Sequence, residues 1–272
     1  MLPKIVGFLL NILSIFSSKS AARIAFKLFS VPRKGQITKQ QAVFLDSAIQ
    51  NIFYYKNNQI MTYKWKGNKD TVLLIHGWES NAGRWMDLIT DLQKKDYTIV
   101  ALDAPAHGNS GSLLFNAVLY AEFINVITKQ FKPTIMVAHS MGGLAAAFSI
   151  SKYKIKNIQK LILAGVPCKY SDVIMRYAHM MKYKKTIISK LKNSITEHFN
   201  VSPEALSTAK NIEKLNTKGL IIHDKEDNII PYNDALIIKS SLKNSKLIST
   251  KGFGHSLKDS SVNSKIIEFI TS

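Results

Sequence analysis

Cysteine and arginine are scarce in this chain of 272 residues. The single cysteine, Cys168, excludes an internal disulfide and fits a reducing compartment, so we expect a cytoplasmic protein. Only four of the 37 basic residues are arginines, whereas proteins that read nucleic-acid sequences usually depend on arginine. The net charge of +19 therefore predicts a basic, solvated surface and no nucleic-acid partner.

Linkers, internal repeats and nucleotide-binding loops are also missing. No stretch is rich in proline, glycine or serine in the manner of a linker, and no Gly-x-x-x-x-Gly-Lys run is present, so nucleotide use is not expected. His179, His198 and His223 lack the spacing of metal ligands, and we predict neither a metal nor a cofactor. With 46% hydrophobic residues, the chain is long enough for one large folded domain.

The first 40 residues form a separate amphipathic segment. Its apolar run from Ile5 to Phe16 is too short to cross a bilayer and is interrupted by Asn11. Ser18-Lys19-Ser20 is a poor cleavage site for a signal peptide. Apolar residues recur at helical spacing, which predicts one or two helices that dock on the protein itself, with peripheral membrane contact or export as alternatives.

From about residue 50 onward, strand and helix patterns alternate. A predicted hairpin (IFYYKNNQIMTYKWKG) precedes apolar runs typical of buried parallel strands: TVLLIHG, TIVALDAP, TIMVAHS, LILAGVP and GLIIHD, with SKLIST as a weaker last strand. Helical patterns occupy Ala82 to Lys94, Leu114 to Phe131, Gly142 to Tyr153 and Ser260 to Phe269. These units predict a three-layer α/β sandwich over residues 41–272, with a mostly parallel sheet flanked by helices.

Residues 169–210 interrupt this alternation with a long helical pattern rich in lysine and methionine. A connection of that length inside an α/β sheet predicts an inserted helical lid, and the alternative is a longer crossover. Met180 and Tyr183 within it are candidate residues of an apolar substrate pocket, although they fit the core of the lid equally well.

The stretch MVAHSMGG suggests a nucleophile. Ser140 ends an apolar strand, and the small residues Gly142 and Gly143 open the following helix. A nucleophile on a sharp strand-to-helix turn needs small neighbours, and the helix N-terminus favours an oxyanion. A structural serine at a strand end is the alternative. His139, beside the serine, is a candidate for the pocket or for packing of the turn.

A serine nucleophile needs a base and a carboxylate that orients the base. Asp224 ends the GLIIHD strand, Asp227 follows it, and His255 lies in a glycine-flanked loop after the last strand. All of these residues are expected at the carboxyl ends of parallel strands, where ligands bind in α/β sheets.

Together these motifs resemble those of the α/β-hydrolases over roughly residues 50–272. HGW at residues 76–78 resembles the oxyanion loop, and DAPAHGNS at 103–110 resembles the Asp-x-x-Gly-His-Gly-x-Ser segment. AHSMGG matches the nucleophile elbow except that Ala138 replaces a glycine, and DNIIP at 227–231 resembles the pattern around the acid. The resemblance also implies that His76 and His107 make structural hydrogen bonds.

The resemblance implies a role for each matching residue. Ser140 would attack an acyl carbon, His255 would be the base and Asp227 would orient it, with the backbone N–H groups of Trp78 and Met141 as the oxyanion hole. The expected function is hydrolysis of a small-molecule carboxylic ester or thioester through an acyl-enzyme. A non-catalytic binding protein of this fold and a lipid ester hydrolase at a membrane surface are the alternatives.

Overall fold

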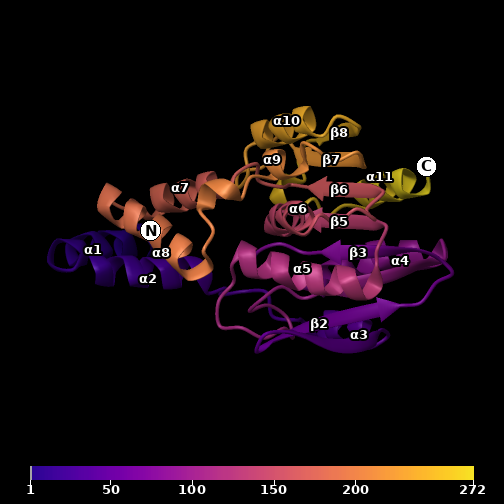
Figure 1. Ribbon diagram of the computed structural model, residues 1–272, viewed down its shortest axis with the longest axis horizontal. Helices are drawn as coiled ribbons and strands as arrows, with labels where there is room; N and C mark the ends of the chain where they lie inside the picture. The colour runs from indigo at the N-terminus through magenta and orange to yellow at the C-terminus, as the bar shows by residue number, and fades with distance from the viewer. Residues whose placement is uncertain (1) are drawn as a thin grey trace.

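The computed structural model describes residues 2–272, which form one eight-stranded sheet covered by helices (Figure 1). The strand order is β1-β2-β4-β3-β5-β6-β7-β8. Strand β2 pairs antiparallel with both β1 and β4, and all other neighbouring strands pair in parallel. The strands are β1 (Ile49–Tyr55), β2 (Asn58–Trp65), β3 (Lys69–Ile75), β4 (Tyr97–Leu102), β5 (Ile135–His139), β6 (Lys160–Ala164), β7 (Lys218–Asp224) and β8 (Ser245–Thr250).

Helices cover both faces of the sheet, which explains why the central strands are apolar runs and not alternating patterns. In β3, Leu73 and Ile75 face one hydrophobic core while Val72 and Leu74 face the other. The first core contains α5 (Ala117–Phe131), α6 (Met141–Tyr153), α9 (Thr208–Ile212) and α10 (Tyr232–Ser241); the second contains α3 (Lys39–Leu45), α4 (Met86–Lys94) and α11 (Ser260–Thr271). The predicted three-layer α/β-hydrolase sandwich is therefore confirmed.

Four helices form a bundle, which we call the cap. They are α1 (Leu2–Phe16), α2 (Ser18–Ser30), α7 (Tyr170–Met181) and α8 (Lys185–Phe199). Residues of α2, α7 and α8 in the cap continue the first core. Figure 1 shows the cap beyond the carboxyl ends of the parallel strands. Its core joins Leu10, Ala21 and Ala25 of the N-terminal segment to Ala178 and Ile187 of the insertion. The N-terminal helices thus dock on the inserted helices, and the two parts of the chain make one body.

Three short 3-10 helices complete the connections: η1 (Ala82–Trp85), η2 (Pro203–Ala205) and η3 (Gly254–Ser256). The first follows the HGW loop, and the third carries His255. None of the helices described between residues 2 and 272 combines the length and the apolar content needed to span a membrane.

Candidate active site

Ser140 lies on a strained turn between β5 and α6. Its φ of +52° and ψ of −128° lie in a region that residues with a side chain rarely adopt. Neighbouring elements hold it there, because its N–H donates to the carbonyl of Ala164 (2.9 Å) and its carbonyl accepts from Gly143 (2.9 Å). Ala138 is fully buried in β5 with an ordinary strand conformation, so this position needs a small residue but not glycine.

Glycines bring the HGW loop against this turn. A Cβ on Gly77 would lie 2.8 Å from the Cβ of Ser140 and 3.0 Å from the carbonyl oxygen of His139. A Cβ on Gly142 would lie 2.2 Å from the carbonyl oxygen of His76. Both contacts are shorter than carbon atoms tolerate, so only glycine permits the loop and the start of α6 to approach this closely.

His255 connects the serine to a carboxylate. Its Nε2 lies 2.9 Å from Ser140 Oγ, and its Nδ1 lies 2.7 Å from Asp227 Oδ2. The three predicted residues come from loops after β5, β7 and β8 and form one hydrogen-bonded chain. This is the arrangement that lets an imidazole take a proton from a serine hydroxyl.

The two candidate aspartates have different partners. Asp227 reaches His255 and also accepts hydrogen bonds from the N–H groups of Ile229 (2.8 Å) and Ile230 (2.9 Å). Asp224 accepts instead from the hydroxyl of Thr250 (2.7 Å) and from backbone N–H groups, including that of Phe253 at 3.0 Å. Asp224 therefore fixes the loop that carries the histidine, while Asp227 contacts the histidine itself.

Asp227 has a second histidine beside it, His223, for which the sequence predicted no role. His223, fully buried at the end of β7, donates from Nε2 to the carbonyl of Ile230 and lies 3.3 Å from Asp227 Oδ2. Burial raises the pKa of Asp227, but hydrogen bonds from His223, His255 and Ile230 outweigh it and hold that pKa well below its usual range. The only sequence signal was a histidine next to an aspartate at a strand end.

His139 contacts the backbone of the His255 loop. Its Nδ1 lies 2.8 Å from Arg84 Nη1, and its Nε2 lies 2.8 Å from the carbonyl oxygen of His255. Because a guanidinium only donates, Nδ1 must accept and Nε2 must carry the proton. Burial lowers the pKa of His139 well below its usual value, and the Arg84 charge lowers it further. Arg84 also donates to the carbonyl of Ser256 (2.9 Å), so the pair braces this loop twice.

These contacts change the interpretation of the predicted pocket residues. Both ring nitrogens of His139 are engaged, one by Arg84 and the other by the His255 loop, in keeping with the packing alternative. Tyr183 is buried in the cap core, where its ring centroid lies 6.0 Å from that of Tyr177. Met180 is 51% exposed on α7. Tyr183 is buried because α1 and α2 pack against the apolar side of α7. Helical periodicity alone does not reveal which helix covers that side.

The predicted oxyanion-hole donors are the N–H groups of Met141 and Trp78, and both residues belong to segments that meet at Ser140. Met141 is the first residue of α6, so its N–H has no acceptor within the helix. Trp78 follows Gly77 in the loop that packs on Ser140, and its ring meets that of Phe115 edge to face with 5.1 Å between the centroids. Both are therefore positioned by the elbow and by the glycine contact.

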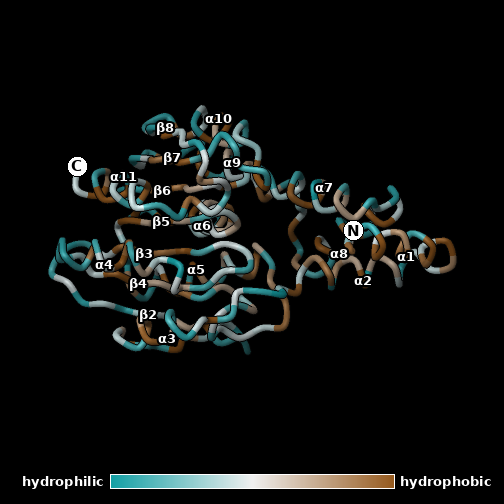
Figure 2. The backbone as a smooth tube through the Cα atoms, turned by 180° about the vertical axis from the view of Figure 1, so that it is seen from behind, coloured by the Kyte–Doolittle hydropathy of each residue, from teal (hydrophilic) through white to brown (hydrophobic). Residues whose placement is uncertain are grey.

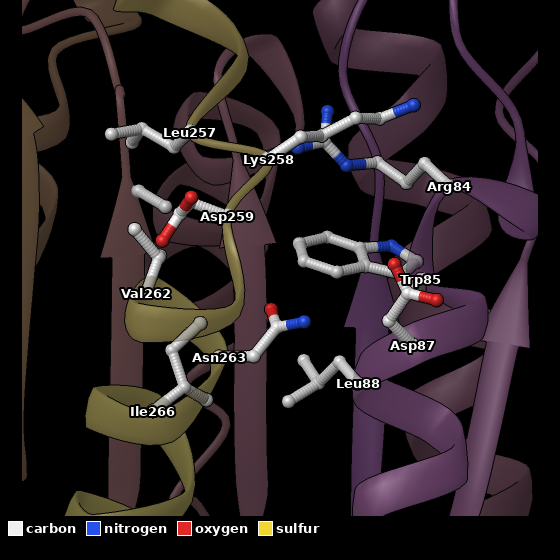
Figure 3. A pocket seen from close by; sticks show the side chains of 11 residues that line it. Arg84, Trp85, Asp87, Leu88, Leu257, Lys258, Asp259, Val262, Asn263 and Ile266 are labelled. Atoms are coloured by element: carbon white, nitrogen blue, oxygen red, sulfur yellow. The ribbon is translucent and has the colours of Figure 1, made fainter. Parts of the chain in front are cut away.

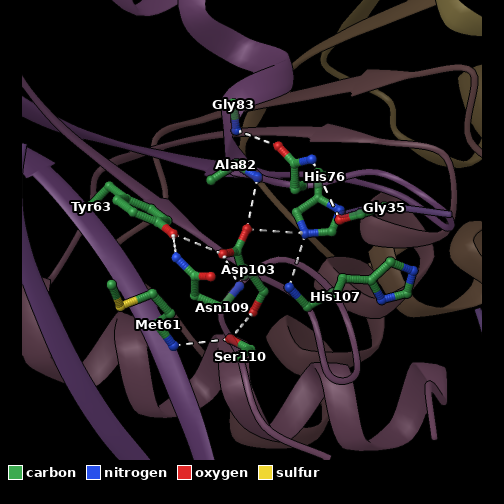
Figure 4. Close-up of polar contacts among 12 residues, drawn as sticks. Gly35, Met61, Tyr63, His76, Ala82, Gly83, Asp103, His107, Asn109 and Ser110 are labelled. Atoms are coloured by element: carbon green, nitrogen blue, oxygen red, sulfur yellow. Dashed lines mark hydrogen bonds and ion pairs between the residues drawn. The ribbon is translucent and has the colours of Figure 1, made fainter. Parts of the chain in front are cut away.

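A buried network around Asp103 supports this loop (Figure 4). The Asp103 carboxylate accepts from the N–H groups of Ala82 (2.8 Å) and Asn109 (2.9 Å) and from the hydroxyl of Tyr63 (3.1 Å). Burial raises the pKa of Asp103 to about 6, although these bonds act in the opposite direction. A Cβ on Gly108 would lie 2.2 Å from this carboxylate, which explains the glycine there.

The two loop histidines make backbone contacts. His76 accepts from the N–H of Ala104 at 2.9 Å (Figure 4), and its Nδ1 lies 2.7 Å from the carbonyl of Gly77. His107 accepts from the N–H of Glu79 at 2.9 Å. Both rings thus join the HGW loop to the segment around residues 103–110, as structural histidines do.

A cavity of about 40 Å³ lies between η1, α4 and α11, beside residues 257–259 (Figure 3). Arg84, Trp85 and Leu257 line it, together with side chains of α11. That volume admits water, and neither Ser140 nor His255 lines it, so the cavity does not coincide with the candidate active site. Between residues 2 and 272, no group of three histidine, cysteine or acidic side chains is arranged to hold a metal ion.

Comparisons with known proteins identify the family of this chain. The chain matches the family model described as serine aminopeptidase, S33, over residues 66–212, more than half of its length. It is 24% identical over 185 residues to putative esterase/lipase 2 of Mycoplasma genitalium (66% of this chain and 68% of that protein) and 19% identical over 250 residues to the AB hydrolase superfamily protein YisY of Bacillus subtilis (76% and 93%).

Solved structures share the fold. A putative lipase from Acinetobacter baumannii has a TM-score of 0.65 at 17% identity, covering 86% of this chain and 94% of that one. The thioesterase domain of the curacin biosynthetic pathway has a TM-score of 0.62 at 16% identity, covering 83% and 99%. With the matched family model and the eight-stranded sheet, the conclusion is that the chain belongs to the S33 family of α/β-hydrolases.

Proposed function

We propose that this protein is a serine hydrolase that cleaves a carboxylic ester or thioester through an acyl-enzyme on Ser140. The observation that carries the proposal is the hydrogen-bonded chain from Ser140 through His255 to Asp227. Relatives named esterase, lipase and thioesterase support the same substrate class. A small-molecule substrate, no nucleic-acid partner and a cytoplasmic location are part of the proposal.

In the first half-reaction, Ser140 Oγ attacks the acyl carbon while His255 Nε2 takes the hydroxyl proton. The charge on the former carbonyl oxygen is stabilised by the N–H groups of Trp78 and Met141. Asp227 is ionised at neutral pH because its pKa is low, so it stabilises the imidazolium of His255. That imidazolium then gives its proton to the leaving alcohol or thiol, and the acyl group stays on Ser140.

In the second half-reaction, His255 takes a proton from water, and the resulting hydroxide attacks the acyl-enzyme. Collapse of the second tetrahedral intermediate releases the carboxylic acid and returns the proton to Ser140. The strained turn at Ser140 contributes by holding the hydroxyl toward His255 before substrate arrives, so little reorganisation is needed.

A fluorophosphonate probe with intact-protein mass spectrometry tests the nucleophile. The wild type should gain one adduct that maps to Ser140, and Ser140→Ala should gain none, while Ser264→Ala, an exposed serine of α11, should label normally. On short p-nitrophenyl esters, Ser140→Ala should lose roughly 10⁴–10⁶-fold in turnover. Labelling of folded Ser140→Ala at the wild-type rate would contradict the assignment.

Substrate class is tested with a panel of esters and thioesters of increasing acyl length, plus an aminoacyl anilide because of the family's name. We expect turnover of esters or thioesters above that of the anilide. A folded protein that labels with the probe but turns over no acyl substrate would favour the non-catalytic binding alternative.

A further inference from the structure

One face of helix α1 packs against the other helices of the cap. A Cβ on Gly7 would lie 1.6 Å from the carbonyl oxygen of Met181, so α1 and α7 cross with their backbones in direct contact. Asn11 donates to the carbonyl of Lys182 (2.7 Å) and accepts from the N–H of Lys184 (2.9 Å), which joins it to both sides of the turn between α7 and α8. These contacts determine which way α1 faces.

The opposite face of α1 is exposed and almost entirely apolar. Of its exposed residues only Lys4 is polar; Phe8 is 64% exposed, Ile15 69% and Phe16 83%. Figure 2 shows the hydrophobic colouring of α1 at the end of the cap that lies away from the sheet. The remaining exposed apolar residues of this face are Leu2, Ile5, Leu9 and Ile12. A contiguous patch of this kind marks an interaction surface, whereas single exposed apolar residues do not.

The surroundings of this face are strongly basic. The first acidic residue of the chain is Asp46, whereas residues 2–34 contain six lysines and arginines. Exposed basic side chains lie on α2 and at the turn between α7 and α8: Lys19, Arg23, Lys27, Lys182, Lys184 and Lys185. A second copy of the chain would bring the same charges together, so self-association is disfavoured, whereas an anionic lipid surface attracts both the charges and the apolar side chains.

We propose that the outer face of α1 is a membrane-docking surface that lies in the headgroup region of an anionic bilayer. Docking combines two signals, insertion of the apolar row and attraction of the surrounding basic residues, and stable peripheral binding needs both. The cap lies at the carboxyl ends of the strands, the edge of the sheet at which Ser140 lies, so docking turns this edge of the molecule toward the lipid (Figure 1). Resting on the proposed function, this identifies the substrate class as an ester or thioester with a membrane-resident acyl chain.

Sedimentation with lipid vesicles tests the surface separately from the chemistry. The Ser140→Ala protein is used so that no lipid is consumed, with vesicles of phosphatidylcholine alone or with 30% phosphatidylglycerol. We expect most of the protein to sediment with anionic vesicles at 50 mM salt, and binding to fall at least five-fold at 500 mM salt or on neutral vesicles. The double variant Phe8→Glu/Ile12→Glu should reduce binding at least tenfold.

The matched control is Val43→Glu/Leu236→Glu, which makes the same charge change at two exposed apolar residues of the sheet domain and should bind like the parent. Equal binding of the α1 variant and the parent would overturn the proposal, as would the absence of binding to anionic vesicles. A concentration-dependent dimer that the α1 variant loses, without vesicle binding, would assign the face to a second copy instead.

The two proposals fail in different ways. The Phe8→Glu/Ile12→Glu variant that retains Ser140 should hydrolyse short, water-soluble esters at the parental rate, because α1 lies outside the triad. It should lose activity on esters presented in anionic vesicles. Equal loss on both substrates would contradict the docking role. Absence of all ester hydrolysis in the parent would contradict the proposed function and leave the vesicle-binding result standing.

Discussion

Gly77→Ala should displace the predicted oxyanion hole without replacing any residue of the Ser140–His255–Asp227 chain. Gly77 does not have a positive φ, so alanine is conformationally allowed and the effect is purely steric. The added Cβ would lie 2.8 Å from the Cβ of Ser140, whereas carbon atoms pack at roughly 3.5–4.0 Å. The HGW loop must therefore retreat from Ser140 by about 1 Å.

A displacement of that size costs little stability but much catalysis. Overpacking of this kind destabilises by about 1–3 kcal/mol, whereas misplacing an oxyanion donor by about 1 Å lowers turnover on the order of 10²-fold. Steady-state kinetics on a short ester should thus show a reduced kcat, and fluorophosphonate labelling should slow in parallel. Circular dichroism melts measure the stability cost.

Ile127→Val in α5 provides the stability control. This buried residue belongs to the core and not to the site, and the substitution costs about 1 kcal/mol. It should lower the melting temperature without changing kcat. If Gly77→Ala keeps parental kcat, or if Ile127→Val loses as much activity, the close contact between loop and nucleophile does not control the oxyanion hole.

Four further substitutions probe other parts of the structure. Asp227→Asn should reduce kcat on the order of 10⁴-fold, whereas Asp224→Asn, which only loosens the loop, should reduce it far less; equal losses would contradict the separate assignments. Ala106→Gly should raise the free energy of unfolding by about 1 kcal/mol in urea, because Ala106 has φ of +62°, and a lower stability would refute this. Arg84→Lys keeps a charge but loses the planar contacts to His139 and the Ser256 carbonyl, so kcat should fall about tenfold with KM unchanged; a change in KM alone would point to substrate binding.

The sequence by itself determined the sheet, the nucleophile elbow and the order of the motifs. Buried parallel strands must be apolar throughout, and a turn like that at Ser140 requires small neighbours. Both features can therefore be recognised from short stretches of the sequence. The parallel arrangement also places every strand end at one edge, which is why residues far apart in sequence were expected together. Alanine at 138 was compatible with this because the strand there has ordinary dihedral angles.

Only the tertiary structure decided which side chains meet. Asp224 ends β7 and Asp227 follows it by three residues. Their partners differ because the end of β8 brings Thr250 to Asp224 while the loop after β8 brings His255 to Asp227. The helical periodicity of α1 predicted an apolar face but not its partner. Packing against α7, with Gly7 at the crossing, buries one side of α1 and leaves an apolar side exposed, since the contact joins segments more than 160 residues apart.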